Sequence, residues 1–204
     1  MKLYYYPGAC SLADHIVLEW TGLEYEAVRV TAQGMKSDEY LRMNPHGQVP
    51  LLVDGDFTLT ENVAILTYLA ELAPGSGLLG DGSFQGKAEV MRWLAHLNSD
   101  VHGAFKPYFA PSRFLVDKAQ AEALALQAQV VVMMYMERLD KHLTSRDWLA
   151  GNSKSIADPY LFVMLRWAKG MGAQDLRHLA KFHDRMLTDA GVIAALTEEE
   201  HGRR

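Results

Sequence analysis

The stretch HGQVPLLV, residues 46–53, decides how the first part of the chain is interpreted. Leu51 to Val53 has the apolar character of a short buried strand, and the turn residues Asp-Gly-Asp follow it. Pro50 has no N–H to donate to a sheet, so it belongs at the first residue of a strand or at a sheet edge. Either the strand simply starts there, or the backbone at Val49 is exposed for a partner outside the chain.

Composition and charge limit the class of protein. The chain has 204 residues, of which 49% are hydrophobic, so it can bury one sizeable core or two small ones. The formal net charge is -5, and no basic stripe indicates nucleic-acid binding. No apolar run approaches the ~20 residues that a membrane span needs. Pro7 comes too early for a signal peptide, and the single cysteine, Cys10, excludes an internal disulfide. We therefore expect a soluble cytoplasmic protein.

The first 73 residues alternate between strand and helix signals, which indicates an α/β domain. Ser11 to Asp14 has the pattern of a capping box, in which a hydroxyl and a carboxylate serve the free N–H groups of a first helical turn. The expected order is βαβ, an irregular helix, then ββα. The predicted strands are residues 3–6, 25–30, 51–53 and 57–59, and the predicted helical segments are residues 12–21, a turn near 40, and 62–72.

The pattern changes after residue 73. The Pro-Gly-Ser-Gly stretch that begins at Pro74 is the best linker in the chain, and long helical patterns follow it. The helix from Ile156 is apolar almost all round, which predicts the buried centre of a second, all-helical domain, and Ser155 to Asp158 forms another capping box. The predicted helices are residues 87–105, 118–143 and 156–169, with two shorter ones after 174.

Four motifs in this order resemble the cytosolic glutathione transferases, in particular their bacterial beta class. The motifs are KLYYYPGACSLADHI, NPHGQVPLL, LTENVAILTYLAEL and SIADPYLFVMLRWA, and the similarity extends from residue 1 to about residue 187. The resemblance implies a thioredoxin-like domain with a mixed sheet (residues 1–73), a linker (74–84) and an all-helical domain (85–204). It also implies a homodimeric detoxification enzyme that conjugates glutathione, its co-substrate, to small hydrophobic electrophiles.

The resemblance also implies a glutathione site in the first domain. In this family the proline after valine is cis, and the backbone of the preceding residue, here Val49, pairs with the cysteinyl unit of glutathione. Pro50 would then turn Val49 outward. Glu61 would pair with the γ-glutamyl ammonium, while the N–H groups at the helix start take the carboxylate. The family usually has serine or glycine after this glutamate, and Asn62 stands there, a residue that caps helices well.

The sulfur chemistry is expected at Cys10, just before the first helix, where the helix dipole and free N–H groups stabilise a thiolate. We therefore expect the Cys10 pKa to lie below its ordinary ~8.5. Cys10 would either hydrogen-bond the glutathione sulfur or form a mixed disulfide that glutathione resolves. Ser11 could donate to the same sulfur, although we expect it mainly to cap the helix. His102 matches a family histidine that faces this cysteine across the cleft. Without the resemblance, Cys10 and His102 read as ordinary packed side chains.

Several further residues follow from the resemblance. Where the family often has a lysine and an asparagine, this chain has Gly103 and Ala95, so two glutathione contacts are expected to be missing. Lys36 is the candidate for the glycine carboxylate. The electrophile pocket is expected around Tyr108, Phe109 and Phe114, and the dimer face on Leu94, Leu97 and Val101.

Two alternative functions stay open. Cys10 could act covalently in a glutathione-dependent thiol–disulfide oxidoreductase or peroxidase. The changes at Asn62, Gly103 and Ala95 would also suit a non-catalytic protein that binds glutathione or another ligand. We expect no metal, because no two of the eight histidines are spaced i, i+4 for a helical ligand pair and the cysteine has no second ligand beside it.

Overall fold

A four-stranded sheet forms the first part of the computed structural model, which describes residues 1–201. The strand order is β2-β1-β3-β4, in which β2 runs parallel to β1 and the other neighbours are antiparallel, so the predicted mixed sheet is confirmed. The strand ends differ from the predicted ones by one residue. The strands are β1 (Lys2–Tyr5), β2 (Glu26–Arg29), β3 (Leu51–Asp54) and β4 (Phe57–Thr60).

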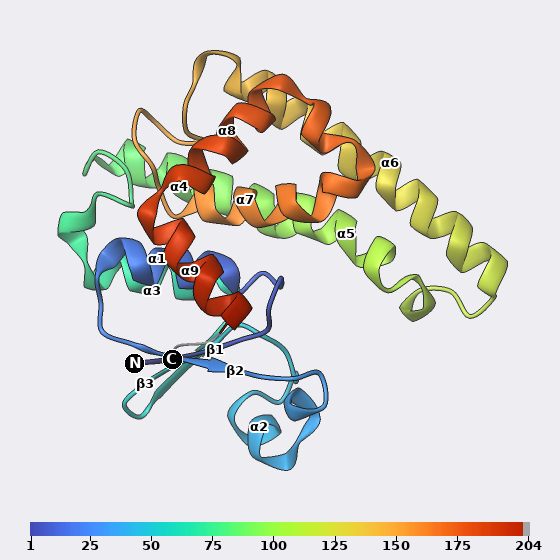
Figure 1. Ribbon diagram of the computed structural model, residues 1–204, viewed down its shortest axis with the longest axis horizontal. Helices are drawn as coiled ribbons and strands as arrows, with labels where there is room; N and C mark the ends of the chain where they lie inside the picture. The colour runs from blue at the N-terminus through green and yellow to red at the C-terminus, as the bar shows by residue number, and fades with distance from the viewer. Residues whose placement is uncertain (202–204) are drawn as a thin grey trace.

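Helices α1 (Leu12–Thr21) and α3 (Asn62–Leu72) lie side by side on one face of this sheet (Figure 1). The short helix α2 (Asp38–Met43) lies away from them, on the opposite side of the sheet. Helix α1 ends at Gly22, which adopts the left-handed conformation (φ 68°) that glycine tolerates without strain. The βαβ-ββα order predicted from the sequence is therefore confirmed.

The second part of the chain is helical, as predicted, but its first long helix is not continuous. The α-helical turns stop at His96, widen into a π-helical segment over Leu97–Val101, and resume at His102. Ser99 donates its hydroxyl hydrogen to the Ala95 carbonyl in this region (2.8 Å), a contact that competes with backbone bonding. The helices are α4 (Phe84–His96), α5 (His102–Phe109), α6 (Lys118–His142), α7 (Ala157–Ala168), α8 (Arg177–Thr188) and α9 (Ala190–His201).

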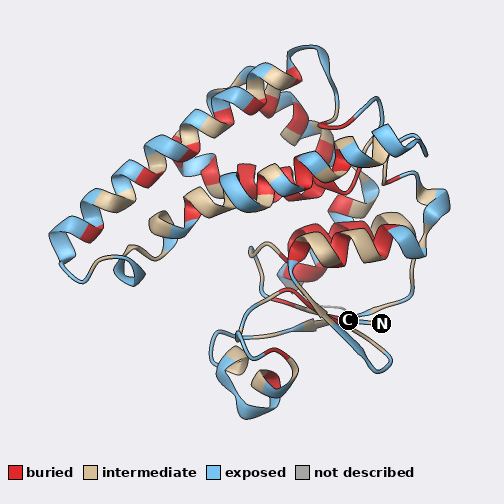
Figure 2. Ribbon diagram, turned by 180° about the vertical axis from the view of Figure 1, so that it is seen from behind, coloured by how far each residue is buried: buried red, intermediate tan, exposed pale blue. Residues whose placement is uncertain are grey.

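Helix α7 is the buried centre of the helical part, as the sequence predicts (Figure 2). Its start is held by Asp158, whose carboxylate accepts hydrogen bonds from the N–H and hydroxyl of Ser155 and from the N–H of Leu149. The predicted Ser155–Asp158 box is thus formed. Burial raises the pKa of Asp158 to about 6, although these hydrogen bonds oppose the shift.

The core runs through both parts of the chain without interruption. Helix α1 packs against α3, α7 and α9, so the last helix returns to the first one and the described chain ends near its beginning (Figure 1). How the chain divides into domains at residues 74–84 stays a prediction. Among residues 1–201, no helix combines the length and the apolar character needed to cross a membrane.

The predicted dimer face is wrong. Leu94, Leu97 and Val101 are each fully buried inside the subunit, where they pack in the common core. The three residues do lie in an apolar surface, but this surface packs against other helices of the same chain and is not available to a second copy.

Candidate active site

A cleft of about 530 Å³ is lined by residues from both parts of the chain. It brings together most of the predicted site residues, which come from distant segments. These residues are Cys10, Val49, Pro50, Glu61, Asn62 and His102. Ser11 and Lys36 do not line the cleft; Lys36 is exposed, and its neighbour Met35 lies there instead.

The segment before β3 presents the backbone of Val49 to the cleft. The Val49–Pro50 peptide bond is cis, as predicted. The preceding carbonyl, of Gln48, accepts hydrogen bonds from the Tyr40 hydroxyl (2.7 Å) and the Asn44 side-chain amide (2.8 Å). These two contacts hold the loop from its other side, through the carbonyl of Gln48. The Val49 carbonyl instead faces Cys10, whose Sγ donates to it at 3.7 Å.

The environment of Cys10 contradicts the predicted acidic thiol. Burial raises the pKa of the Cys10 thiol to about 12, and the Asp14 carboxylate adds to the shift. The N–H of Ala13 bonds to the Cys10 carbonyl (3.0 Å) in a turn that leads into α1, and Asp14 follows in the first turn of that helix. Loss of hydration outweighs the favourable backbone N–H groups at the helix start. The unliganded thiol therefore stays protonated at neutral pH.

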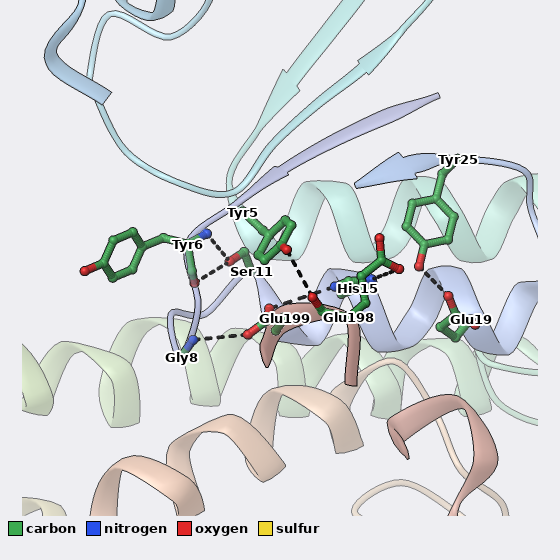
Figure 3. Close-up of polar contacts among 9 residues, drawn as sticks. All are labelled: Tyr5, Tyr6, Gly8, Ser11, His15, Glu19, Tyr25, Glu198 and Glu199. Carbon is green, nitrogen blue, oxygen red and sulfur yellow. Dashed lines mark hydrogen bonds and ion pairs between the residues drawn. The ribbon is translucent and has the colours of Figure 1, made fainter. Parts of the chain in front are cut away.

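Asp14 itself is fully buried, and neither carboxylate oxygen has a hydrogen-bond partner within residues 1–201. Burial raises its pKa well above the ordinary value for an aspartate. The predicted capping box at Ser11 and Asp14 is wrong. Ser11 has helical backbone angles (φ -56°, ψ -20°), and its hydroxyl bridges the N–H (3.3 Å) and carbonyl (3.5 Å) of Tyr6 (Figure 3). Ser11 thus holds the loop that carries Cys10.

Glu61 and Asn62 stand at the start of α3. Glu61 has a positive φ of 73° with ψ 119°, a conformation that costs a non-glycine residue about 1–3 kcal/mol, and such strain often marks a functional site. Asn62 is the first helical residue and does not cap. Its side-chain amide donates to the Cys10 carbonyl (3.3 Å), while its Oδ1 is buried without a partner in the described chain. The Asn62 side chain therefore connects α3 to the loop that carries Cys10.

His102 lies in the cleft as a neutral imidazole. Burial lowers its pKa to about 4, and the charge of Lys106, one turn along α5, acts in the same direction. Its Nδ1 lies 2.7 Å from the hydroxyl of Tyr160, which donates to Asn98 Oδ1 at 2.9 Å. The tyrosine oxygen must then accept from Nδ1–H, which leaves Nε2 as an acceptor. Tyr160 and Asn98 were missed from the sequence, since only the fold brings Tyr160 on α7 to the histidine and to Asn98, which lies four residues before it.

The outer wall of the cleft carries both apolar and positively charged side chains. Phe109 and Phe114 line it as predicted, whereas Tyr108 packs against the core. Lys106 and Arg113 also line it, and both are exposed. These two cations stand in the half of the cleft that the second part of the chain provides.

A second cluster of titratable groups lies outside the cleft, between α1 and α9. His15, Glu19 and Glu198 offer potential metal-ligand atoms within 4.8 Å of one another. His15 contacts Glu198 (3.4 Å), and Glu19 accepts a hydrogen bond from Tyr25 (Figure 3). The expected lack of a metal therefore stays a prediction.

Comparisons with known proteins agree on one family. Residues 1–71 match the family model described as "Glutathione S-transferase, N-terminal domain", and residues 99–189 match "Glutathione S-transferase, C-terminal domain". A glutathione S-transferase of Xanthomonas campestris is 49% identical over 201 residues, which cover 98% of each chain. One of Escherichia coli O157:H7 is 36% identical, again over 98% of each.

Solved structures give the same result. A glutathione S-transferase from Xylella fastidiosa superposes with a TM-score of 0.93 at 44% identity and covers 98% of both chains. A sphingomonad glutathione S-transferase complexed with glutathione superposes with a TM-score of 0.86 at 39% identity, covering 98% of this chain and 100% of its own. A bacterial beta class enzyme of Sphingomonas chungbukensis has the same TM-score of 0.86 at 38% identity, with 98% of both chains covered.

The environment of Cys10 makes its titration predictable. Because the chain has a single cysteine, alkylation by iodoacetamide reports on Cys10 alone. With its pKa at about 12, the alkylation rate should rise about tenfold per pH unit from pH 7 to 10 without a plateau. Asp14→Asn removes a carboxyl group whose charge appears as the pH rises, so it should raise the rate most at the alkaline end of the series, whereas the exposed Asp56→Asn should not. A plateau near neutral pH would contradict this account.

Proposed function

The chain belongs to the glutathione S-transferase family, and we propose that its cleft binds glutathione along Val49 and places the glutathione sulfur between Cys10 and His102. The observation that carries this proposal is the convergence of Cys10, Val49, Glu61 and His102 on one cleft. The electrophile then occupies the wall formed by Phe109 and Phe114.

Each end of glutathione finds a complementary group. The cysteinyl backbone pairs with the N–H and carbonyl of Val49, and the γ-glutamyl ammonium pairs with Glu61. The γ-glutamyl carboxylate lies at the N-terminus of α3, where backbone N–H groups favour an anion. Lys36 does not line the cleft, so we assign the glycine carboxylate to the lining cations Lys106 and Arg113.

The protonation states of the cleft favour a transferase over a disulfide exchanger. Neutral His102 accepts a hydrogen bond from the glutathione thiol at Nε2, and the thiol proton leaves to solvent as the thiolate forms. Cys10 keeps its own proton, so it can turn from the Val49 carbonyl and donate a hydrogen bond to the glutathione thiolate. The thiolate attacks the electrophilic carbon, the C–S bond forms, and the leaving group departs with the bonding electrons. A covalent role for Cys10 requires a thiolate that its burial disfavours.

Substitution of Cys10 separates the candidate functions. Cys10→Ala should lower kcat with an aryl halide by about 10- to 100-fold, the effect of losing one hydrogen bond to a charged acceptor. Cys10→Ser keeps a donor and should retain more activity, while any thiol transfer by the wild type should vanish in both variants because the chain has no other cysteine. Loss of all conjugation in Cys10→Ser would favour the covalent oxidoreductase, and a wild type that binds glutathione without conjugation would favour the binding protein.

Substitution of Glu61 tests the orientation of glutathione. Glu61→Gln removes the charge that faces the γ-glutamyl ammonium, so it should weaken glutathione binding by about 1.5–3 kcal/mol. Isothermal titration calorimetry measures this loss, and Asp56→Asn is the control because Asp56 is exposed in the turn between β3 and β4. Unchanged affinity in a folded variant would make Glu61 a solvated surface acid.

We also propose that the enzyme is a homodimer and that α6 carries its interface. Four apolar side chains on the outer face of α6 are 42–64% exposed, which favours burial against a second copy. These residues are Leu126, Val130, Val131 and Met134.

Sedimentation analysis tests this surface. The wild type should have twice the subunit mass at micromolar concentration, and Val130→Asp should shift it toward the monomer because it buries a charge in an apolar interface. Val116→Asp changes a fully exposed valine outside α6 and should leave the mass unchanged. A monomeric wild type would refute the dimer.

A further inference from the structure

A tight turn precedes Cys10 and sets where its sulfur lies. The N–H of Ala9 bonds to the Tyr6 carbonyl at 3.0 Å, which closes a turn with Pro7 and Gly8 in its central positions. Gly8 has a φ of 77°, a conformation that suits glycine and strains other residues. Only Ala9 lies between Gly8 and Cys10, so a movement of the Gly8 peptide displaces the Cys10 sulfur.

Two side chains from the helical part hold this glycine at its two polar groups. Glu199, on α9, accepts a hydrogen bond from the Gly8 N–H at Oε2 (3.1 Å; Figure 3). Trp167, on α7, donates its indole N–H to the Gly8 carbonyl at 2.8 Å. The turn is therefore fixed by residues that lie about 160 and 190 positions away in the chain.

A buried carboxylate such as that of Glu199 carries a large desolvation cost for a purely structural contact. Glu199 is only 4% exposed, and burying a carboxylate is unfavourable unless hydrogen bonds replace its lost hydration. Its second oxygen, Oε1, has no hydrogen-bond partner within residues 1–201, and the nearest cationic candidate, His15 Nδ1, lies at 3.9 Å. The hydrogen bond that it does make is therefore to the loop that carries Cys10.

Trp167 connects the same loop to the opposite wall of the cleft. Its ring centroid lies 5.0 Å from that of His102 and 5.4 Å from that of Phe109. A single side chain thus contacts the cysteine loop, the histidine and the wall assigned to the electrophile. Its displacement would change the distance between the two sides of the cleft.

We propose that Glu199 and Trp167 form a clamp on Gly8 and act as positioning residues, which hold Cys10 against Val49 and at a fixed distance from His102. Neither residue touches the reacting atoms. The effect on catalysis rests on the proposed function, whereas the effect on the position of Cys10 does not.

Alkylation of the single cysteine tests the clamp without glutathione. Trp167→Phe keeps an aromatic ring but removes the donor, and Glu199→Ala removes the acceptor. Each should free the turn, expose Cys10 and raise its rate of alkylation by iodoacetamide by about 3- to 10-fold, the equivalent of one hydrogen bond. Glu199→Gln keeps an oxygen acceptor and should stay close to the wild type. Glu200→Ala is the matched control, since Glu200 is the exposed neighbour on α9.

Steady-state kinetics tests the consequence for catalysis. Trp167→Phe and Glu199→Ala should lower kcat with an aryl halide by about 3- to 10-fold while the KM for glutathione changes little, because Val49 and Glu61 still bind it. A purely structural role would lower the melting temperature and leave the alkylation rate and kcat unchanged. Glu199→Gln should restore kcat.

Three results would overturn the clamp. The first is an unchanged alkylation rate in both folded variants, and the second is a lower melting temperature as their only effect. The third is a Glu199→Gln variant that behaves as Glu199→Ala does, since charge and not hydrogen bonding would then matter. Faster alkylation supports the clamp even if the wild type shows no transferase activity, a result that would refute only the proposed function.

Discussion

The enclosure of helix α1 is the constraint on which the rest of the structure depends. The seven residues from Leu12 to Leu18 are all buried, because α3, α7 and α9 pack around the helix and the sheet covers it from below. The enclosed helix includes two buried ionisable residues, Asp14 and His15. The enclosure also fixes the loop that precedes the helix. The site is therefore assembled by the contact between the two parts of the chain, because Glu199 and Trp167, from the helical part, hold Gly8 in the loop before Cys10.

The same enclosure decides the chemistry of the cleft. A cysteine at a helix N-terminus is expected to ionise easily, but here loss of hydration and the Asp14 charge act in the opposite direction and dominate. His102 is kept neutral by burial as well, so the cleft holds one hydrogen-bond donor, the Cys10 thiol, and one acceptor, His102 Nε2. Burial thus keeps a thiolate charge off Cys10.

The sequence predicted the fold better than the site. Strand and helix patterns placed nearly every element, and the HGQVPLLV stretch predicted the cis bond at Pro50, because these features follow from local spacing and a recognisable motif. The failures share a physical cause. An apolar stripe shows that Leu94 and Leu97 are covered, but not whether the same chain or a second copy covers them. Likewise, the dipole argument for Cys10 used only its own helix, whereas desolvation comes from elements distant in the sequence, as do Tyr160, Trp167 and Glu199.

A crystal structure with glutathione bound tests the central claim most directly. We expect the cysteinyl N–H and carbonyl of glutathione to pair with the backbone of Val49, and its sulfur to accept a hydrogen bond from the Cys10 thiol on the side that faces His102. Glutathione with its sulfur directed away from Cys10, or bound without any contact to Val49, would contradict it.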